Sequence, residues 1–179
     1  MSKNVVVIST SLRANSNSDA LAKRFAEGAR EAGNTVEFIS LKGKSIGFCI
    51  GCLACQSKGE CVIKDDAIEI TEKVLNADVV AWATPIYYYE MSGQMKTLID
   101  RMNSMYPKEY KFRDVYFMAT AAEDEEYVPE KAVAGLQGWI DCYEKAELKG
   151  SVFCGGVNDA GDINGNDKLA AAYEMGKNI

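Results

Sequence analysis

The stretch that most constrains the fold is an unbroken run of β-branched residues near the start of the chain, Val5 to Ile8. A strand with apolar side chains on both faces must be covered on both faces, which is typical of a parallel sheet. The run leads at once into Ser9 to Ser18, a segment rich in hydroxyls and amides. Apolar residues then recur at helical spacing from Leu21 to Ala32. The stretch therefore predicts a strand, a polar loop and a helix in direct succession.

The same alternation of strand and helix continues to the end of the chain. Further strands are predicted at 35–41, 78–84, 115–122 and 148–154, and further helices at 67–76, 95–105, 133–143 and 169–173. Alternation of this kind predicts an α/β fold, with a five-stranded parallel sheet and helices on both of its faces. A chain of 179 residues without a repeat or a linker is expected to form a single domain, residues 1–179.

Composition and charge narrow the class of protein further. The chain has 20 basic and 26 acidic residues, a net charge of −6, which argues against a nucleic-acid or anionic-membrane partner. No stretch approaches the roughly 20 apolar residues that cross a bilayer, and the N-terminus lacks a signal-peptide core, so we expect a cytoplasmic protein. The absence of histidine from the sequence excludes Ser-His-Asp and Cys-His nucleophilic sites. An enzyme of this composition needs a cofactor for its difficult step, and no catalytic side chain is predicted.

A ligand site is expected at one edge of the predicted sheet. In doubly wound sheets, ligands bind beyond the C-terminal ends of the strands, at the point where the strand order reverses. The loops after the first, third and fourth predicted strands all leave the sheet at that edge. These loops are therefore expected to build one site together.

The first of these loops has the composition of an anion site. A helix N-terminus offers unpaired N–H groups and a partial positive charge, hydroxyls can donate to phosphate oxygens, and arginine can make a forked contact. The loop has neither a Walker lysine nor a G-x-G-x-x-G run, so the monophosphate of flavin mononucleotide (FMN) suits it better than a triphosphate. The alternative is a serine-rich turn that only caps the helix. The candidate phosphate-binding residues are Ser9, Ser11, Arg13, Ser16, Asn17 and Ser18.

The other two loops offer a surface for the flavin ring. An aromatic and apolar strand exit can form a flat wall against an isoalloxazine, with backbone amides free to contact its polar edge. Small residues after the fourth strand would let the ring lie close to the backbone. A competing interpretation is aromatic packing in the core or at a dimer contact. The candidate ring-binding residues are Pro85, Ile86, Tyr87, Tyr88, Thr120 and Ala121.

A cysteine-rich loop at 42–64 contains the spacing C-x2-C-x2-C-x5-C. Such spacing lets successive thiolates converge on one centre, as in a [4Fe–4S] site. Zinc, a redox-active disulfide and free thiols are the alternatives. The remaining cysteines, Cys142 and Cys154, are expected to be buried core thiols. The candidate metal ligands are Cys49, Cys52, Cys55 and Cys61.

Taken together, these motifs resemble those of the flavodoxin-like NAD(P)H-dependent FMN reductases, and more narrowly those of the iron–sulfur flavoproteins. The resemblance implies a flavodoxin-like sheet of order 2-1-3-4-5, a tightly bound FMN, and a homodimer or a dimer of dimers. Many relatives have glycine where Ser9 or Thr10 stands here. The matching segments are Ser9–Ser18 with Leu21-Ala22, Thr84–Tyr87, Ser92–Arg101, the cysteine run and Asp65-Asp66.

The function that this resemblance implies is an NAD(P)H oxidoreductase, which passes electrons from the nicotinamide substrate through FMN to a small-molecule or redox-protein acceptor. The alternative is an electron carrier, in which a [4Fe–4S] cluster links a ferredoxin-like donor to FMN. A third hypothesis is a flavin-bound redox sensor with a protein partner, for which the acidic loop Glu123 to Glu126 is a candidate docking patch.

Overall fold

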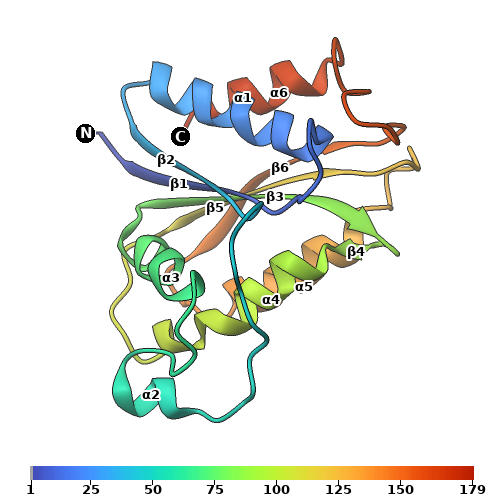
Figure 1. The fold of residues 1–179 in the computed structure, drawn as a ribbon. Helices are drawn as coiled ribbons and strands as arrows, with labels where there is room; N and C mark the ends of the chain where they lie inside the picture. Colours follow the sequence, from blue (N-terminus) through green and yellow to red (C-terminus); the bar gives the residue numbers. More distant parts are fainter. Residues whose placement is uncertain (1) are drawn as a thin grey trace.

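The computed structural model describes residues 2–179 and shows a parallel sheet as its central layer (Figure 1). The strands pair in the order β2-β1-β3-β5-β6, which is 2-1-3-4-5 when the parallel strands alone are counted. The predicted fold class and strand order are thus confirmed. The strands are β1 (Asn4–Ser9), β2 (Thr35–Ser40), β3 (Val79–Tyr87), β5 (Asp114–Thr120) and β6 (Glu147–Cys154).

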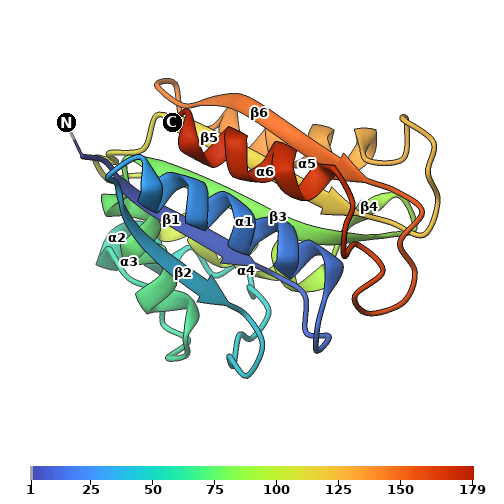
Figure 2. The ribbon, with the colours of Figure 1, turned by 90° about the horizontal axis from the view of Figure 1, so that it is seen from above.

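Helices cover both faces of this sheet, as Figures 1 and 2 show. One face carries α1 (Asn17–Glu31) and α6 (Lys168–Lys177), which lie side by side. The other face carries α3, α4 and α5, and the short helix α2 lies away from the sheet in the cysteine-rich loop. These elements are α2 (Ala54–Lys58), α3 (Ala67–Asn76), α4 (Gly93–Arg101) with the 3₁₀ helix η1 (Met102–Met105), and α5 (Glu130–Ile140).

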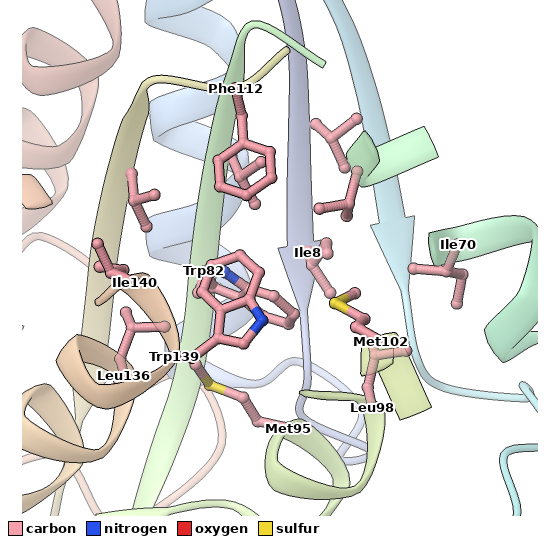
Figure 3. Close-up of a cluster of buried hydrophobic side chains, with 14 of the residues drawn as sticks. Ile8, Ile70, Trp82, Met95, Leu98, Met102, Phe112, Leu136, Trp139 and Ile140 are labelled. Carbon is pink, nitrogen blue, oxygen red and sulfur yellow. The ribbon is translucent and has the colours of Figure 1, made fainter. Parts of the chain in front are cut away.

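The first strand is buried on both faces, as its sequence predicts. Val5 and Val7 belong to the apolar cluster under α1 and α6, whereas Val6 and Ile8 belong to the cluster on the opposite face. Figure 3 shows the centre of the second cluster, where the rings of Trp82 and Trp139 meet edge to face with centroids 5.8 Å apart. Because side chains alternate across a strand, a continuous apolar run fills two cores.

Two glycines allow α1 and α6 to pack closely. A Cβ atom on Gly28 would lie 2.0 Å from the carbonyl oxygen of Tyr173, and one on Gly176 would lie 2.0 Å from that of Phe25. Any larger residue would force the helices apart. The close approach fixes α6, and with it the loop 155–165 between β6 and α6.

The segment after β3 differs from its prediction as a loop. It forms a hairpin with the short strand β4 (Glu90–Met91), which pairs with β3 antiparallel. The turn residues Tyr88 and Tyr89 both have positive φ angles, 51° and 65°. Such turns usually contain asparagine or glycine, so the two tyrosines gave no sequence signal for a hairpin.

The carboxylate of Asp66 accepts hydrogen bonds from Ser45 N–H and Lys44 Nζ, and so holds the loop before α3. One local prediction about the cysteines was wrong. Cys142 is exposed rather than buried, because α5 ends at Ile140, whereas Cys154 is buried as expected. Across residues 2–179, none of the helices has the length and apolar character that crossing a membrane requires.

Candidate functional site

The loop between β1 and α1 presents its polar groups where the helix begins. Ser16 is the N-cap of α1, and its hydroxyl accepts a hydrogen bond from Asp19 N–H at 3.4 Å. The Ser11 hydroxyl accepts one from Arg13 N–H at 3.3 Å. Both serines are buried. Their hydroxyls thus stand beside the unpaired N–H groups of a helix start, which is the arrangement that binds anions.

A cavity of about 210 Å³ opens at this point, beyond the C-terminal ends of the strands. One part of its wall is polar and comes from the β1–α1 loop, and another is mainly apolar and comes from the ends of β3 and β5. It therefore has the two kinds of surface that an amphiphilic cofactor requires. The lining residues are Ser11, Arg13, Ser16, Asn17, Pro85, Ile86, Tyr87, Thr120, Ala121, Ala122, Val157 and Asn158.

Three of the predicted residues do not line this cavity. Ser9 is still part of β1, and its buried hydroxyl has no hydrogen-bond partner among the residues described. Ser18 is buried in the first turn of α1, with its hydroxyl 3.1 Å from that of Ser16. Tyr88 sits at the tip of the hairpin and is 99% exposed.

The loop 155–165 also contributes to the cavity, which the sequence analysis missed. Asn17, 6% exposed, donates to the carbonyl oxygens of Val157 and Asp159 and accepts from Gly161 N–H and Ile163 N–H. This buried amide therefore ties the loop to α1. The rule that placed three strand ends at this edge also applies to the fifth parallel strand and could have found the loop.

Arg13 crosses from the first loop to this last one. Its guanidinium donates to the carbonyl oxygen of Asn158 at 2.6 Å and lies 3.7 Å from the carboxylate of Asp159. The side chain is half exposed, so this ion pair is weak and the arginine can turn to another anion.

The hairpin residues Tyr88 and Tyr89 border a second cavity of about 180 Å³, which shares Ile86, Ala121 and Ala122 with the first. Tyr89 donates to the Glu123 carboxylate at 2.8 Å and its ring stacks against Tyr127. The hydrogen bond to Glu123 raises the pKa of Tyr89 to about 12. Tyr89 therefore borders the second cavity with its hydroxyl already paired.

The four cysteines of the loop 42–64 surround a small apolar cavity of about 20 Å³. Gly51 N–H donates to the Cys49 sulfur and Asn103 Nδ2 donates to the Cys55 sulfur, both at 3.5 Å. All four are free thiols. Within residues 2–179, no three His, Cys, Asp or Glu side chains are arranged to hold a single metal ion. The thiols thus face one space without the tight convergence that zinc demands.

A buried ion pair holds this loop to the core. The Arg101 guanidinium makes a forked contact with Asp65 at 2.6 and 2.9 Å, and donates to the carbonyl oxygens of Gly47 and Ile63. The Arg101 side chain is 0% exposed. Burial alone would raise the pKa of Asp65, but hydrogen bonds from Arg101, Gly47 N–H and Ala67 N–H outweigh it and lower the pKa. Burial alone would likewise lower the pKa of Arg101, and its contacts with Asp65 and Cys61 raise it.

Comparison with known sequences places these features in a family. The sequence model of the family described as NADPH-dependent FMN reductase matches residues 3–128. An iron–sulfur flavoprotein of Archaeoglobus fulgidus is 45% identical over 71 residues, 40% of this chain and 32% of that protein. One from Methanocaldococcus jannaschii is 39% identical over 97 residues, 54% of this chain and 50% of that protein. The chain thus spans about a third to a half of the length of these relatives.

A third relative matches over a longer stretch. An iron–sulfur flavoprotein of Methanosarcina thermophila is 26% identical over 151 residues, 84% of this chain and 79% of that protein. Among solved structures, an NAD(P)H:quinone oxidoreductase from Methanothermobacter marburgensis has a TM-score of 0.75, with 20% identity over 99% of this chain and 96% of its own. An azoreductase from Bacillus anthracis has a TM-score of 0.73, with 14% identity over the whole of both chains. These structures show the same fold.

Proposed function

This chain belongs to the NADPH-dependent FMN reductase family, and on that basis we propose that it binds FMN and oxidises NAD(P)H. Electrons then pass to a small-molecule or redox-protein acceptor. The observation that carries the proposal is the cavity of about 210 Å³, where a polar helix start meets an apolar wall at the C-terminal edge of the sheet. Nine of the twelve residues that the sequence predicted for FMN line this cavity.

The residues present fit both ends of FMN. Ser11, Ser16 and the first N–H groups of α1 supply donors for a phosphate, and Arg13 adds a positive charge at the rim. Pro85 and Ile86 offer an apolar wall for the ring. FMN, when bound, supplies the hydride-accepting chemistry, so the chain itself needs no acid or base. The protein's part is to hold the ring in one orientation.

A titration with FMN tests this proposal directly. We expect the protein to bind FMN with quenching of the flavin fluorescence. Arg13→Gln should weaken the affinity about tenfold, since a charge-assisted hydrogen bond contributes about 1.5–3 kcal/mol and Arg13 must first leave Asn158. Arg24→Gln, which removes an exposed charge of α1 away from the cavity, is the matched control. Absence of FMN binding by the wild-type protein would disprove the proposal.

A second candidate function is electron transfer through a [4Fe–4S] cluster. It is favoured by the cavity that all four loop cysteines border, and by the name that the curated relatives carry. A [4Fe–4S] cluster is held by four thiolates, which is the number of cysteines that line this cavity. Anaerobic purification followed by iron and acid-labile sulfide analysis tests this candidate. About four iron and four sulfide atoms per chain would favour the electron carrier. Their absence would favour the reductase without a cluster.

The assembly and location stay predictions. A homodimer or tetramer is supported by exposed apolar side chains beside the cavity, among them Leu12, Tyr87 and Tyr88. Sedimentation equilibrium of the FMN-bound protein would test it, and a monomer would contradict it. Six free cysteines suit the reducing cytoplasm.

A further inference from the structure

Two sulfurs of the cysteine-rich loop accept hydrogen bonds from N–H groups. The sulfur of Cys49 accepts a hydrogen bond from Gly51 N–H, and the sulfur of Cys55 accepts one from Asn103 Nδ2. Arg101 borders the same cavity as Cys61, and its buried Nε has no hydrogen-bond partner among the residues described. N–H donors thus contact two of the four sulfurs of this loop, and a third, unpaired N–H group belongs to a residue that lines the same cavity.

Such an arrangement is poorly matched to neutral thiols. A thiol is only a weak acceptor, and a buried N–H group without a partner is rare because it costs about 1–3 kcal/mol. Donors next to anionic sulfur instead form charge-assisted hydrogen bonds. Among the residues that line this cavity, the only side-chain acceptors are the four sulfurs and the amide oxygen of Asn103. Arg101 can only donate, and the remaining lining residues are apolar. The donor set therefore suits the metal-bound thiolates of a cluster held by these cysteines.

The two side-chain donors come from one rigid element. Arg101 ends α4 and Asn103 lies in η1, which continues that helix. The forked contact with Asp65 fixes the Arg101 guanidinium, while its contacts with Gly47 and Ile63 hold the loop on both sides of the cysteines. Figure 1 shows this loop, with α2, as an extension below the α3 and α4 layer. The donors are thus preorganised by the core while the cysteines are carried by a loop.

We propose that Arg101 and Asn103 are positioning residues for an anionic four-sulfur centre at Cys49, Cys52, Cys55 and Cys61, and that their N–H groups raise its reduction potential. The inference rests on the proposed cluster and adds residues that the cysteine spacing does not reveal. Reduction adds one negative charge to the centre. Hydrogen bonds to sulfur stabilise that extra charge, so removing a donor shifts the potential to more negative values.

The test uses anaerobically reconstituted, FMN-bound protein and the variant Asn103→Leu, which keeps a similar volume but has no donor. Iron and sulfide content are measured first, and the midpoint potential of the centre is then measured by a redox titration followed by electron paramagnetic resonance. We expect full iron content and a more negative midpoint potential. Lys96→Gln, an exposed position of α4 paired with Asp100, is the control and should match the wild type.

A second variant, Arg101→Lys, retains the positive charge but loses the Nε donor and the fork. It should lower the midpoint potential further, or lower the iron content if the loop is loosened. Because a substitution at the buried Arg101 could prevent folding, the test of the inference rests on Asn103→Leu. Equal potentials in Asn103→Leu and wild-type protein at full iron content would overturn this inference alone. Wild-type protein that binds FMN but takes up no iron and sulfide would overturn the cluster as well, while the flavin proposal would stand.

Discussion

One buried side chain holds each of two long loops: Arg101 holds the cysteine-rich loop and Asn17 holds the loop 155–165. The first side chain is charged and the second is neutral. Arg101 reaches the backbone of the cysteine-rich loop at Gly47 and Ile63, and needs Asp65 to balance its charge. Asn17 reaches the loop 155–165 with no counter-charge. A guanidinium only donates, so burying it requires an acceptor of opposite charge, whereas an amide both donates and accepts. The charged anchor is therefore the more costly one to break.

The largest expected effect comes from removing that charge alone. Arg101→Met leaves Asp65 buried without its partner, and should lower the free energy of unfolding by about 3–5 kcal/mol. Urea denaturation followed by circular dichroism measures it. The double variant Arg101→Met with Asp65→Asn should lose only about 1–2 kcal/mol, because no uncompensated charge remains. Equal losses in the two variants would show that the ion pair is not the anchor.

The ion pair of Asp65 and Arg101 also predicts that the free energy of unfolding depends on pH. This change should be smaller than the loss caused by Arg101→Met. The pKa of Asp65 is lowered in the folded protein, so its stabilising contribution is complete above the ordinary value of 3.8 and disappears as the pH falls through the lowered pKa. The free energy of unfolding should therefore decline as the pH falls below about 4. The double variant should show a shallower decline in denaturation curves at successive pH values. Parallel curves would argue against Asp65 as the titrating group.

The neutral anchor should have a smaller effect on stability. Asn17→Ala leaves Gly161 N–H and Ile163 N–H without their acceptor, and should cost about 2 kcal/mol. Hydrogen exchange should increase mainly in the loop 155–165. Asn76→Ala, at an exposed helix position, is the control. Uniform loss of protection across the protein would contradict a local anchor.

The smallest effect separates helix capping from ligand binding. Ser16 and Ser92 are the N-caps of α1 and α4, and each accepts a backbone hydrogen bond in the first turn of its helix. Ser16→Ala and Ser92→Ala should each cost about 1 kcal/mol of stability. Only Ser16 borders the cavity, so only Ser16→Ala should also weaken FMN binding in a fluorescence titration. Equal FMN affinities would limit Ser16 to capping.

Of the four serines predicted to bind the phosphate, the two in the turn between β1 and α1 line the cavity and the two within the adjoining strand and helix do not. Ser11 and Ser16 line the cavity because they lie in the turn between β1 and α1. Ser9 and Ser18 do not line it, because the strand and the first helical turn bury them. A hydroxyl-rich composition cannot distinguish these positions, since orientation follows from strand register and helix phase. The hairpin of Tyr88 and Tyr89 was missed because its turn lacks the usual residues.

The sequence by itself determined the α/β alternation and the edge of the sheet where a site is expected, and its resemblance to a known family implied the strand order. The alternation and the expected edge follow from local patterns: a doubly apolar strand, its polar exit and the succession of strands and helices. Only the tertiary structure decided that Asn17 anchors a loop about 140 residues away. It alone also placed Arg101 beside the cysteines, through contacts with residues 36 to 54 positions earlier. A periodic pattern records burial along one element, but not which distant backbone groups a buried polar side chain will meet.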